Sequence, residues 1–252
     1  MDLSQPLGLT ETTSPTPGAN SAQAMASLMG LAIFGEKVAA RTYVAMAELR
    51  DDYAELLRKF AAMEARHGAS FLEASRANGV EPDREFAEGE LGYLIEQVDR
   101  YAANRDFDAL AVLQGFIVES LAIATYEPFL GIADRYTGAR EAFATALADE
   151  HYHVDWITRY LRLRYFDQTG EFLALAERVN VQGIDCVGGT MMNIASFLDV
   201  IGMSGADCAG GLLDGYAGLL EGVGLDQRTA LKNVSTLFAP LLTKYHRRER
   251  AT

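Results

Sequence analysis

The sequence has few of the residues that mark disulfide-bonded, membrane-spanning or nucleic-acid-binding proteins. Its 252 residues include only two cysteines, Cys186 and Cys208, which predicts reduced thiols rather than a disulfide framework. Lys and Arg number 22 against 35 Asp and Glu, and the resulting net charge of −13 argues against a nucleic-acid partner. The apolar runs are interrupted before they reach the roughly 18 residues of a membrane span. We therefore expect a cytoplasmic protein that binds neither nucleic acid nor membrane.

Proline is also scarce, and its distribution divides the chain. Three of the six prolines, Pro6, Pro15 and Pro17, fall in the first twenty residues. Residues 1–20 are predicted to be a flexible arm, without the positive start and apolar stretch of a signal peptide. A chain that is 49% hydrophobic can bury one sizeable core, so residues 21–245 are predicted to form a single domain. Residues 246–252 are predicted to be a basic tail.

The pattern of apolar residues predicts an all-α protein, because strand-like alternation is nowhere sustained. Helices are expected over 21–49, 52–77, 82–103, 107–136 and 139–165, the fourth of them bent at Pro128. The remainder, 170–248, reads as three or four shorter helices rich in glycine. Glycine weakens helices, so this density indicates either close helix approach or a mobile lid.

Histidine is also scarce, with four in the chain. Two of them stand three residues after a glutamate, and each such pair is preceded by a lone glutamate on an earlier helix. The order Glu, Glu-x-x-His, Glu, Glu-x-x-His is typical of a dinuclear metal site inside a four-helix bundle. The set consists of Glu36, Glu64, His67, Glu119, Glu150 and His153.

The chemistry of these six residues suits iron. Residues three apart share one helix face, so each Glu–His pair can reach the same ion. Carboxylate and imidazole groups suit Fe(II), and two divalent ions neutralise four carboxylates that would be costly to bury alone. With Glu64 and Glu150 bridging two irons, positions remain open for O2 and substrate. The pattern therefore predicts two Fe ions and O2 as co-substrate.

Neighbouring residues extend the candidate site. Tyr43 and Tyr126 each follow a predicted ligand by seven residues, which returns them to the ligand's helix face. They are either hydrogen-bond donors to carboxylate or substrate, or ordinary core aromatics. Asp149 is a candidate to orient a histidine of a neighbouring helix through its ring N–H. His151 points about 100° away from Glu150 and is predicted to lie at the surface.

These residues sit within motifs that resemble the aldehyde-deformylating oxygenases of cyanobacteria, a ferritin-like diiron family. The similarity covers roughly residues 25–240. It is carried by Met63–His67 with Phe71, Gln114, Ala122–Tyr126, Ala133-Asp134, Asp149-Glu150 and Tyr216–Gly224. The resemblance implies a ferritin-like bundle with extra C-terminal helices, two irons and an external electron donor. It also implies a long-chain aldehyde that binds in an apolar tunnel and is converted to an alkane and formate. By the same resemblance Gln114, like Tyr43 and Tyr126, would line the pocket or support a ligand.

Other functions remain open at this stage. A diiron N-oxygenase that oxidises an amine, hydroxylamine or hydrazine would use the same scaffold. Iron storage, or a non-catalytic ferritin-like role, is the alternative outside enzymes. For an enzyme the expected partners are a small-molecule substrate and an electron donor, either a ferredoxin or another reductase. The basic residues Lys244, Arg247, Arg248 and Arg250 either dock that donor or form a solvated tail.

Overall fold

The computed structural model describes residues 21–249, with the side chains of residues 182, 185 and 240–249 outside the description. Every regular element in this part of the chain is helical, which confirms the all-α prediction. The predicted N-terminal arm, 1–20, and the end of the basic tail, 250–252, lie outside the described residues. The backbone of 246–249 continues the last helix to Glu249.

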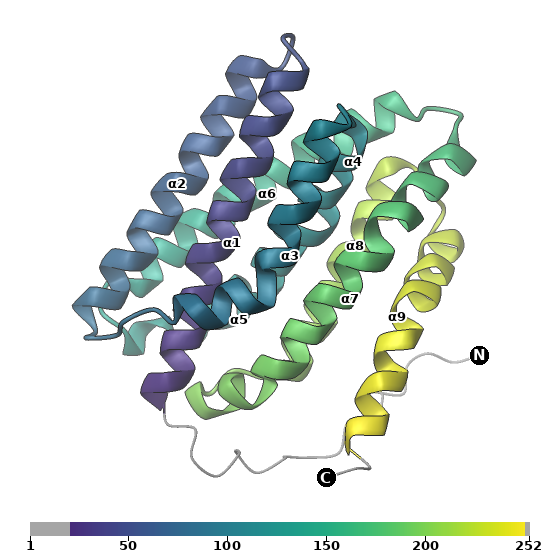
Figure 1. Cartoon of the computed structure of the whole chain (residues 1–252). Coiled ribbons are helices and arrows are strands. Elements are labelled where there is room, and N and C mark those ends of the chain that lie inside the picture. The colour runs from purple at the N-terminus through teal and green to yellow at the C-terminus, as the bar shows by residue number, and fades with distance from the viewer. Residues whose placement is uncertain (1–20, 250–252) are drawn as a thin grey trace.

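Four helices form the bundle that holds the predicted ligands (Figure 1). They are α1 (Ser21–Leu49), α2 (Ala54–Ala77), the broken helix that runs from α4 (Phe107–Leu113) to α5 (Ser120–Leu130), and α6 (Ala139–Arg164). Helix α1 packs against α2, and α2 packs against α6, which in turn contacts α5. Helix α3 (Arg84–Ala103) covers α1 from outside, as expected of a helix without ligands.

The remaining helices pack against the other side of the bundle (Figure 1). They are α7 (Thr169–Ile201), α8 (Gly205–Val223) and α9 (Gln227–Glu249). The prediction of shorter helices is wrong for α7, which at 33 residues is longer than any other helix in the described part of the chain. Its apolar side packs against α1, α3 and α4. Burial of that surface outweighs the low helix propensity of its glycines.

The predicted helix 107–136 is the other element that differs from expectation. A π-helical turn, η1 (Gln114–Glu119), interrupts it, and α5 ends at Leu130 before a short 3-10 turn, η2 (Ala133–Arg135). The interruption does not coincide with Pro128, which lies inside α5. It is stabilised by the Ser120 hydroxyl, which donates a hydrogen bond to the Gly115 carbonyl five residues earlier, at 3.0 Å. Apolar periodicity cannot reveal such a turn, because every residue of η1 is buried.

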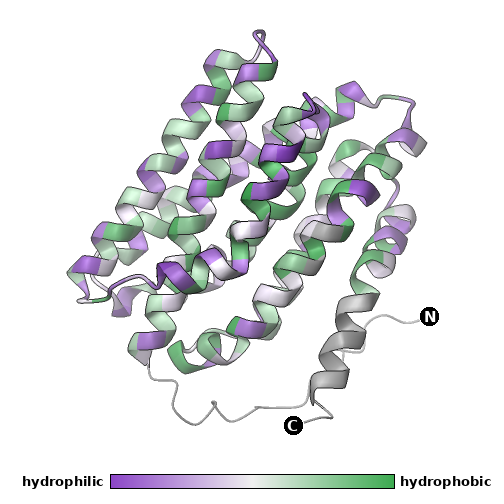
Figure 2. Ribbon diagram, viewed as in Figure 1, coloured by the Kyte–Doolittle hydropathy of each residue, from purple (hydrophilic) through white to green (hydrophobic). Residues whose placement is uncertain are grey.

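This central helix is long and apolar enough to cross a membrane, which the expectation from interrupted apolar runs did not anticipate. Residues Phe107–Leu130 pass that test, but 78% of the apolar window is buried inside the bundle. Helix α7 passes only if its two halves, bent by 46°, count as one span. Figure 2 shows the hydrophobic colouring concentrated on helices in the interior, with hydrophilic residues on the outer faces of α2 and α3. The segment is therefore a core helix.

Glycines permit close helix packing at several contacts. Close packing is one of the two explanations that the sequence offered for the glycine-rich C-terminal segment. A Cβ at Gly183 would lie 2.9 Å from Cγ1 of Ile117, and one at Gly222 would lie 2.6 Å from Cγ2 of Thr158. In contrast, a Cβ at Gly189 would meet nothing within 4 Å. Close approach thus explains part of the glycine content, and the lid remains a prediction.

We predict that Gly30→Ala destabilises the fold. A Cβ at Gly30 would lie 2.3 Å from the backbone oxygen of Asp83, the residue that caps α3 by accepting a hydrogen bond from the Phe86 N–H. Backbone cannot move aside cheaply, so the free energy of unfolding should fall by about 2–3 kcal/mol. Chemical denaturation measures this. The control is Gly89→Ala on the exposed face of α3, where a Cβ meets nothing and helix propensity should raise stability by about 0.5–1 kcal/mol. Equal stabilities of the two variants would contradict the packing argument.

Candidate metal centre

The bundle brings all six predicted ligands together at its centre. Glu36 comes from α1, Glu64 and His67 from α2, Glu119 from the end of η1, and Glu150 and His153 from α6. All six are at most 3% exposed. Their potential ligand atoms form two groups, each with its atoms within 4.8 Å of one another: Glu36, Glu64, His67 and Glu150, and Glu64, Glu119, Glu150 and His153. The groups share Glu64 and Glu150, the two residues that the sequence predicted to bridge.

The two groups have nearly matching geometry. In the first, Nδ1 of His67 lies 3.1 Å from Glu64 Oε2, 3.4 Å from Glu150 Oε1 and 3.5 Å from Glu36 Oε2. In the second, Nδ1 of His153 lies 2.9 Å from Glu64 Oε1, 3.1 Å from Glu150 Oε2 and 3.5 Å from Glu119 Oε1. Each group thus offers one imidazole, one glutamate of its own and two shared glutamates.

The buried carboxylates of the cluster are unfavourable in their charged form unless cations bind beside them. Burial, together with the nearby Glu64 carboxylate, raises the pKa of Glu36 to about 8, although hydrogen bonding to His67 opposes the rise. Burial and the charges of Glu119, Glu64 and Glu36 raise the pKa of Glu150 well above its usual range. Without cations, some of these carboxylates must hold protons. Divalent ions would remove that need, because they supply the positive charge directly.

Buried polar atoms at the centre also lack partners among the described residues. Oε1 of Glu64 accepts no hydrogen bond, although His153 Nδ1 is close to it. Oε1 of Gln114 and Nε2 of His153 are likewise buried without a partner. An unsatisfied oxygen on Glu64, one of the two shared glutamates, fits a site built for a bound ion. The donor set, four carboxylates and two imidazoles with no thiolate, suits iron or a similar divalent ion.

Four further side chains hold the predicted ligands in place. The Tyr43 hydroxyl donates to Glu119 Oε1 at 2.5 Å, and the Tyr126 hydroxyl donates to Glu36 Oε1 at 2.6 Å. Each tyrosine therefore contacts the glutamate of the other helix, not the ligand seven residues before it. These contacts brace α1 against α5 and η1 across the centre, and burial raises the pKa of both phenols well above 10.

Gln114 and Asp149 complete this set. The amide of Gln114 donates to Glu119 Oε1 at 2.9 Å. In a regular α-helix two residues five apart would point about 140° away from each other, so the π turn is what brings this pair together. Asp149 Oδ2 lies 2.9 Å from Nε2 of His67, whereas the other ring nitrogen, Nδ1, lies near the glutamates. His151 is exposed, as its helix position predicts.

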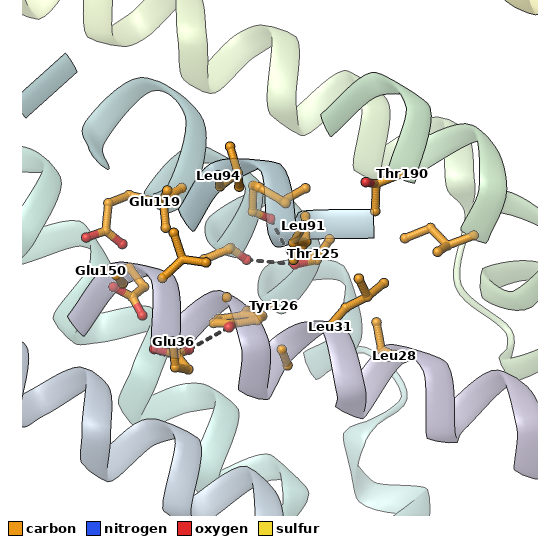
Figure 3. Close-up of a pocket in the computed structure, with 18 residues that line it drawn as sticks. Leu28, Leu31, Glu36, Leu91, Leu94, Glu119, Thr125, Tyr126, Glu150 and Thr190 are labelled. Atoms are coloured by element: carbon orange, nitrogen blue, oxygen red, sulfur yellow. Dashed lines mark hydrogen bonds between the residues drawn. The ribbon is translucent and has the colours of Figure 1, made fainter. Parts of the chain in front are cut away.

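An apolar cavity opens beside the carboxylates (Figure 3). Its lining includes Glu36, Glu119 and Glu150 at one end, and Leu28 and Thr190 lie toward the other. The other lining residues are Leu31, Ala32, Gly35, Val38, Ala39, Leu91, Leu94, Val118, Leu121, Ala122, Thr125, Tyr126 and Ile194.

Most of this lining was missed from the sequence. Leu91 and Leu94 come from α3, a helix without any predicted ligand. A signal for the α1 wall does exist, because Leu28, Leu31 and Gly35 recur at helical spacing on the face that leads to Glu36. Thr125 adds little polarity, since its hydroxyl donates to the carbonyls of Leu121 and Ala122.

The fold and the buried cluster define a ferritin-like, carboxylate-rich metal-binding bundle. Residues 19–238 match the family model described as long-chain fatty aldehyde decarbonylase, and the chain belongs to this family. It is also similar to a solved structure titled protein 19 with aldehyde deformylating oxidase activity, from Synechococcus. The two are 26% identical, with a TM-score of 0.80, over 87% of this chain and 98% of that one.

These comparisons confirm the resemblance read from the sequence. They show an oxidoreductase of the oxygenase type on the aldehyde-deformylating scaffold, and they do not favour the N-oxygenase alternative. Such an enzyme acts on a small molecule.

We predict that Tyr126→Phe weakens the brace between α5 and α1. It removes the donor to the buried Glu36 carboxyl, and an unsatisfied buried acceptor costs about 1–3 kcal/mol. Thermal or chemical denaturation should show that loss. The control is Tyr136→Phe, since Tyr136 stacks on Phe129 and makes no hydrogen bond through its hydroxyl among the described residues. A loss from Tyr136→Phe as large as that from Tyr126→Phe would refute a specific role for the brace.

Proposed function

We propose that this enzyme binds two iron ions and uses O2 to convert an aliphatic aldehyde into formate and an alkane one carbon shorter. The observation that carries the proposal is the pair of overlapping ligand groups at the end of an apolar cavity. Glu36 and His67 would hold one ion, Glu119 and His153 the other, and Glu64 and Glu150 would bridge them. When bound, the irons would supply O2 activation and electron storage, which protein side chains lack.

The cavity supports the choice of an aliphatic substrate. Its walls are leucine, isoleucine, valine, alanine and glycine over most of their length, and its three carboxylates gather at one end. An alkyl chain would gain free energy by leaving water for such walls. Its aldehyde carbon would then be the part of the molecule placed beside Glu36, Glu119 and Glu150. The wall residues would also keep water away from the reacting atoms.

The bracing residues have a distinct part in the proposal. Tyr43 and Gln114 fix Glu119, and Tyr126 fixes Glu36, so both terminal carboxylates keep one orientation while the substrate enters. Asp149 would hold His67 with Nδ1 toward the ion, by accepting the proton of Nε2. We propose these four as positioning residues rather than groups that exchange protons with substrate.

The overall reaction needs reducing power from outside the chain. One aldehyde, one O2, four protons and four electrons balance one alkane, one formic acid and one water. Cys186 and Cys208 are free thiols, which could supply at most two of these four electrons by forming a disulfide, so a donor protein would have to deliver the electrons. Absence of a disulfide also agrees with the reducing cytoplasm, where we place the enzyme.

We predict that Glu36→Ala halves the metal content. The variant removes one terminal ligand and leaves the second group of ligands complete, so bound iron should fall from two ions to one per chain. Anaerobic titration of metal-free protein with Fe(II), followed by elemental analysis, measures the ratio. Glu48→Ala on the exposed side of the same helix should keep both ions. Two ions retained by Glu36→Ala would remove this residue from the ligand set.

The reaction itself is tested with iron-loaded protein, O2, a chemical reductant and a panel of medium- and long-chain aldehydes. Gas chromatography should find the alkane one carbon shorter, with formate in equal amount. Glu36→Ala should abolish both products, and Glu48→Ala should change neither. If O2 is consumed while neither product forms, aldehyde deformylation is wrong and nitrogen oxidation of a small metabolite becomes the hypothesis to test.

A further inference from the structure

Glu119 differs from the other predicted ligands in its backbone. The other five lie inside the regular helices α1, α2 and α6, whereas Glu119 is the last residue of the π turn η1. A π turn contains one more residue than the α-helical turn that it replaces, and such turns often occur at functional sites. The orientation of the Glu119 carboxylate therefore depends on the formation of this turn.

The π turn determines which groups surround the Glu119 carboxylate. Oε1 of Glu119 accepts hydrogen bonds from Gln114 at 2.9 Å and from Tyr43 at 2.5 Å, and His153 Nδ1 lies 3.5 Å from it. If residues 114–119 formed a regular α-helix, Gln114 and Glu119 would point about 140° apart, and their hydrogen bond would be lost. Loss of the π turn would thus remove a contact that fixes this carboxylate beside His153.

Ser120, a buried residue outside the ligand set, makes a hydrogen bond that requires the π turn. Its hydroxyl donates to the Gly115 carbonyl, five residues earlier, at 3.0 Å. In a regular α-helix a serine hydroxyl reaches back only three or four residues, as Ser75 of α2 does when it donates to the Phe71 carbonyl at 2.8 Å. The backbone N–H of Ser120 bonds to the Ile117 carbonyl, so the contact with Gly115 is made by the side chain.

The other contacts of η1 do not select one type of turn as this hydrogen bond does. A Cβ at Gly115 would lie 2.8 Å from Cγ2 of Ile157, so the glycine lets η1 approach α6, the helix that carries two predicted ligands. The ring of Phe116 lies 5.1 Å from that of Tyr216, between centroids. Apolar packing is non-directional, whereas a hydrogen bond specifies the carbonyl that it meets. The Ser120 hydroxyl therefore distinguishes the π turn from a regular one.

We infer that Ser120 is a positioning residue for the metal ion that Glu119 and His153 would bind. Its hydroxyl stabilises η1, and η1 in turn places the Glu119 carboxylate beside His153. Ser120 itself would touch neither the ion nor the substrate. The inference rests on the proposed function in that it requires two ions in each chain. Only one of them would depend on the π turn, because Glu36, the corresponding ligand of the other ion, lies in a regular helix.

Binding of Fe(II) to variants that keep one ion tests the inference without using the reaction. In Glu36→Ala the ion at Glu119 should remain, and adding Ser120→Ala should weaken its binding by about tenfold or more. In Glu119→Ala the ion at Glu36 should remain, and adding Ser120→Ala should change its affinity by less than about twofold. Anaerobic titration of metal-free protein against a competing chelator measures the dissociation constants. Equal weakening of both ions, or of neither, would overturn the inference.

Ser75→Ala is the matched control, because it also removes a buried serine hydroxyl that donates to a helix carbonyl. It should lower the thermal stability as Ser120→Ala does, yet leave the affinity of Glu36→Ala for its ion unchanged. An equal loss of affinity from the two serine variants would reduce Ser120 to a structural role and contradict the inference.

Ser120→Cys provides the test if Ser120→Ala fails to fold. It nearly keeps the size of the side chain and offers a weaker hydrogen-bond donor. In the Glu36→Ala background its affinity for Fe(II) should fall between those of Ser120 and Ser120→Ala proteins. An affinity equal to that of Glu36→Ala alone would contradict the inference.

A crystal structure of metal-free Ser120→Ala protein separates this inference from the proposed function. Glu119 should lose its contact with Gln114 or adopt more than one conformation, and an unchanged π turn with this contact intact would overturn the inference. If wild-type protein binds no iron, the proposed function fails, whereas this structure still decides whether Ser120 holds the turn. If wild-type protein binds two irons and makes no alkane, the proposed reaction is wrong and Fe(II) binding still decides the part of Ser120.

Discussion

Burial of four carboxylates at the centre of a helical bundle is the constraint on which the rest of the structure depends. Charged groups in such a place are very costly unless they are paired and hydrogen-bonded. Each feature around the cluster reduces that cost: two imidazoles among the carboxylates, phenols on Glu36 and Glu119, and an amide on Glu119. The remaining imbalance, visible in the raised pKa of Glu36 and Glu150, is the charge that two divalent ions would neutralise.

The surrounding architecture follows from the same requirement. The central helix, α4 to α5, is surrounded by other helices and is therefore apolar on nearly all sides. It must still place the Glu119 carboxylate toward the other ligands. The π turn η1 lets Gln114 and Glu119 face each other there. Helices α7 and α8 then cover this apolar surface, and α3 closes the other flank. Between α1, α3, α5 and α7 the packing leaves the cavity that ends at the carboxylates.

Much of this arrangement could be predicted from the sequence, because its strongest signals are local. The spacing of Glu64–His67 and Glu150–His153 depends only on helix geometry, and it led to the six clustered residues. Helix ends at 49, 77, 103 and 164 fell within a residue of expectation, since loops and capping residues mark them. The π turn left no mark, because an inserted residue in a uniformly apolar segment does not change its composition. The length of α7 was missed for a related reason: its glycines weaken the local signal, and its stability comes from contacts with distant helices.

The residues that line the cavity could not be predicted, because contacts between helices that are distant in sequence bring them together. Leu91 and Leu94 of α3 look like any amphipathic helix face, and only the packing of α3 on α1 turns them into a wall. The partners of Tyr43 and Tyr126 were also out of reach, because each hydrogen bond crosses from one half of the bundle to the other. Local spacing thus identifies which residues belong to the site, whereas contacts between helices determine how they are held.

The most direct test of the central claim is a crystal structure of iron-loaded protein with diffraction data collected at the iron absorption edge. The account predicts two anomalous peaks, both between Glu64 and Glu150, one beside Glu36 and His67 and the other beside Glu119 and His153. A single peak, or iron bound away from these six side chains, would contradict it.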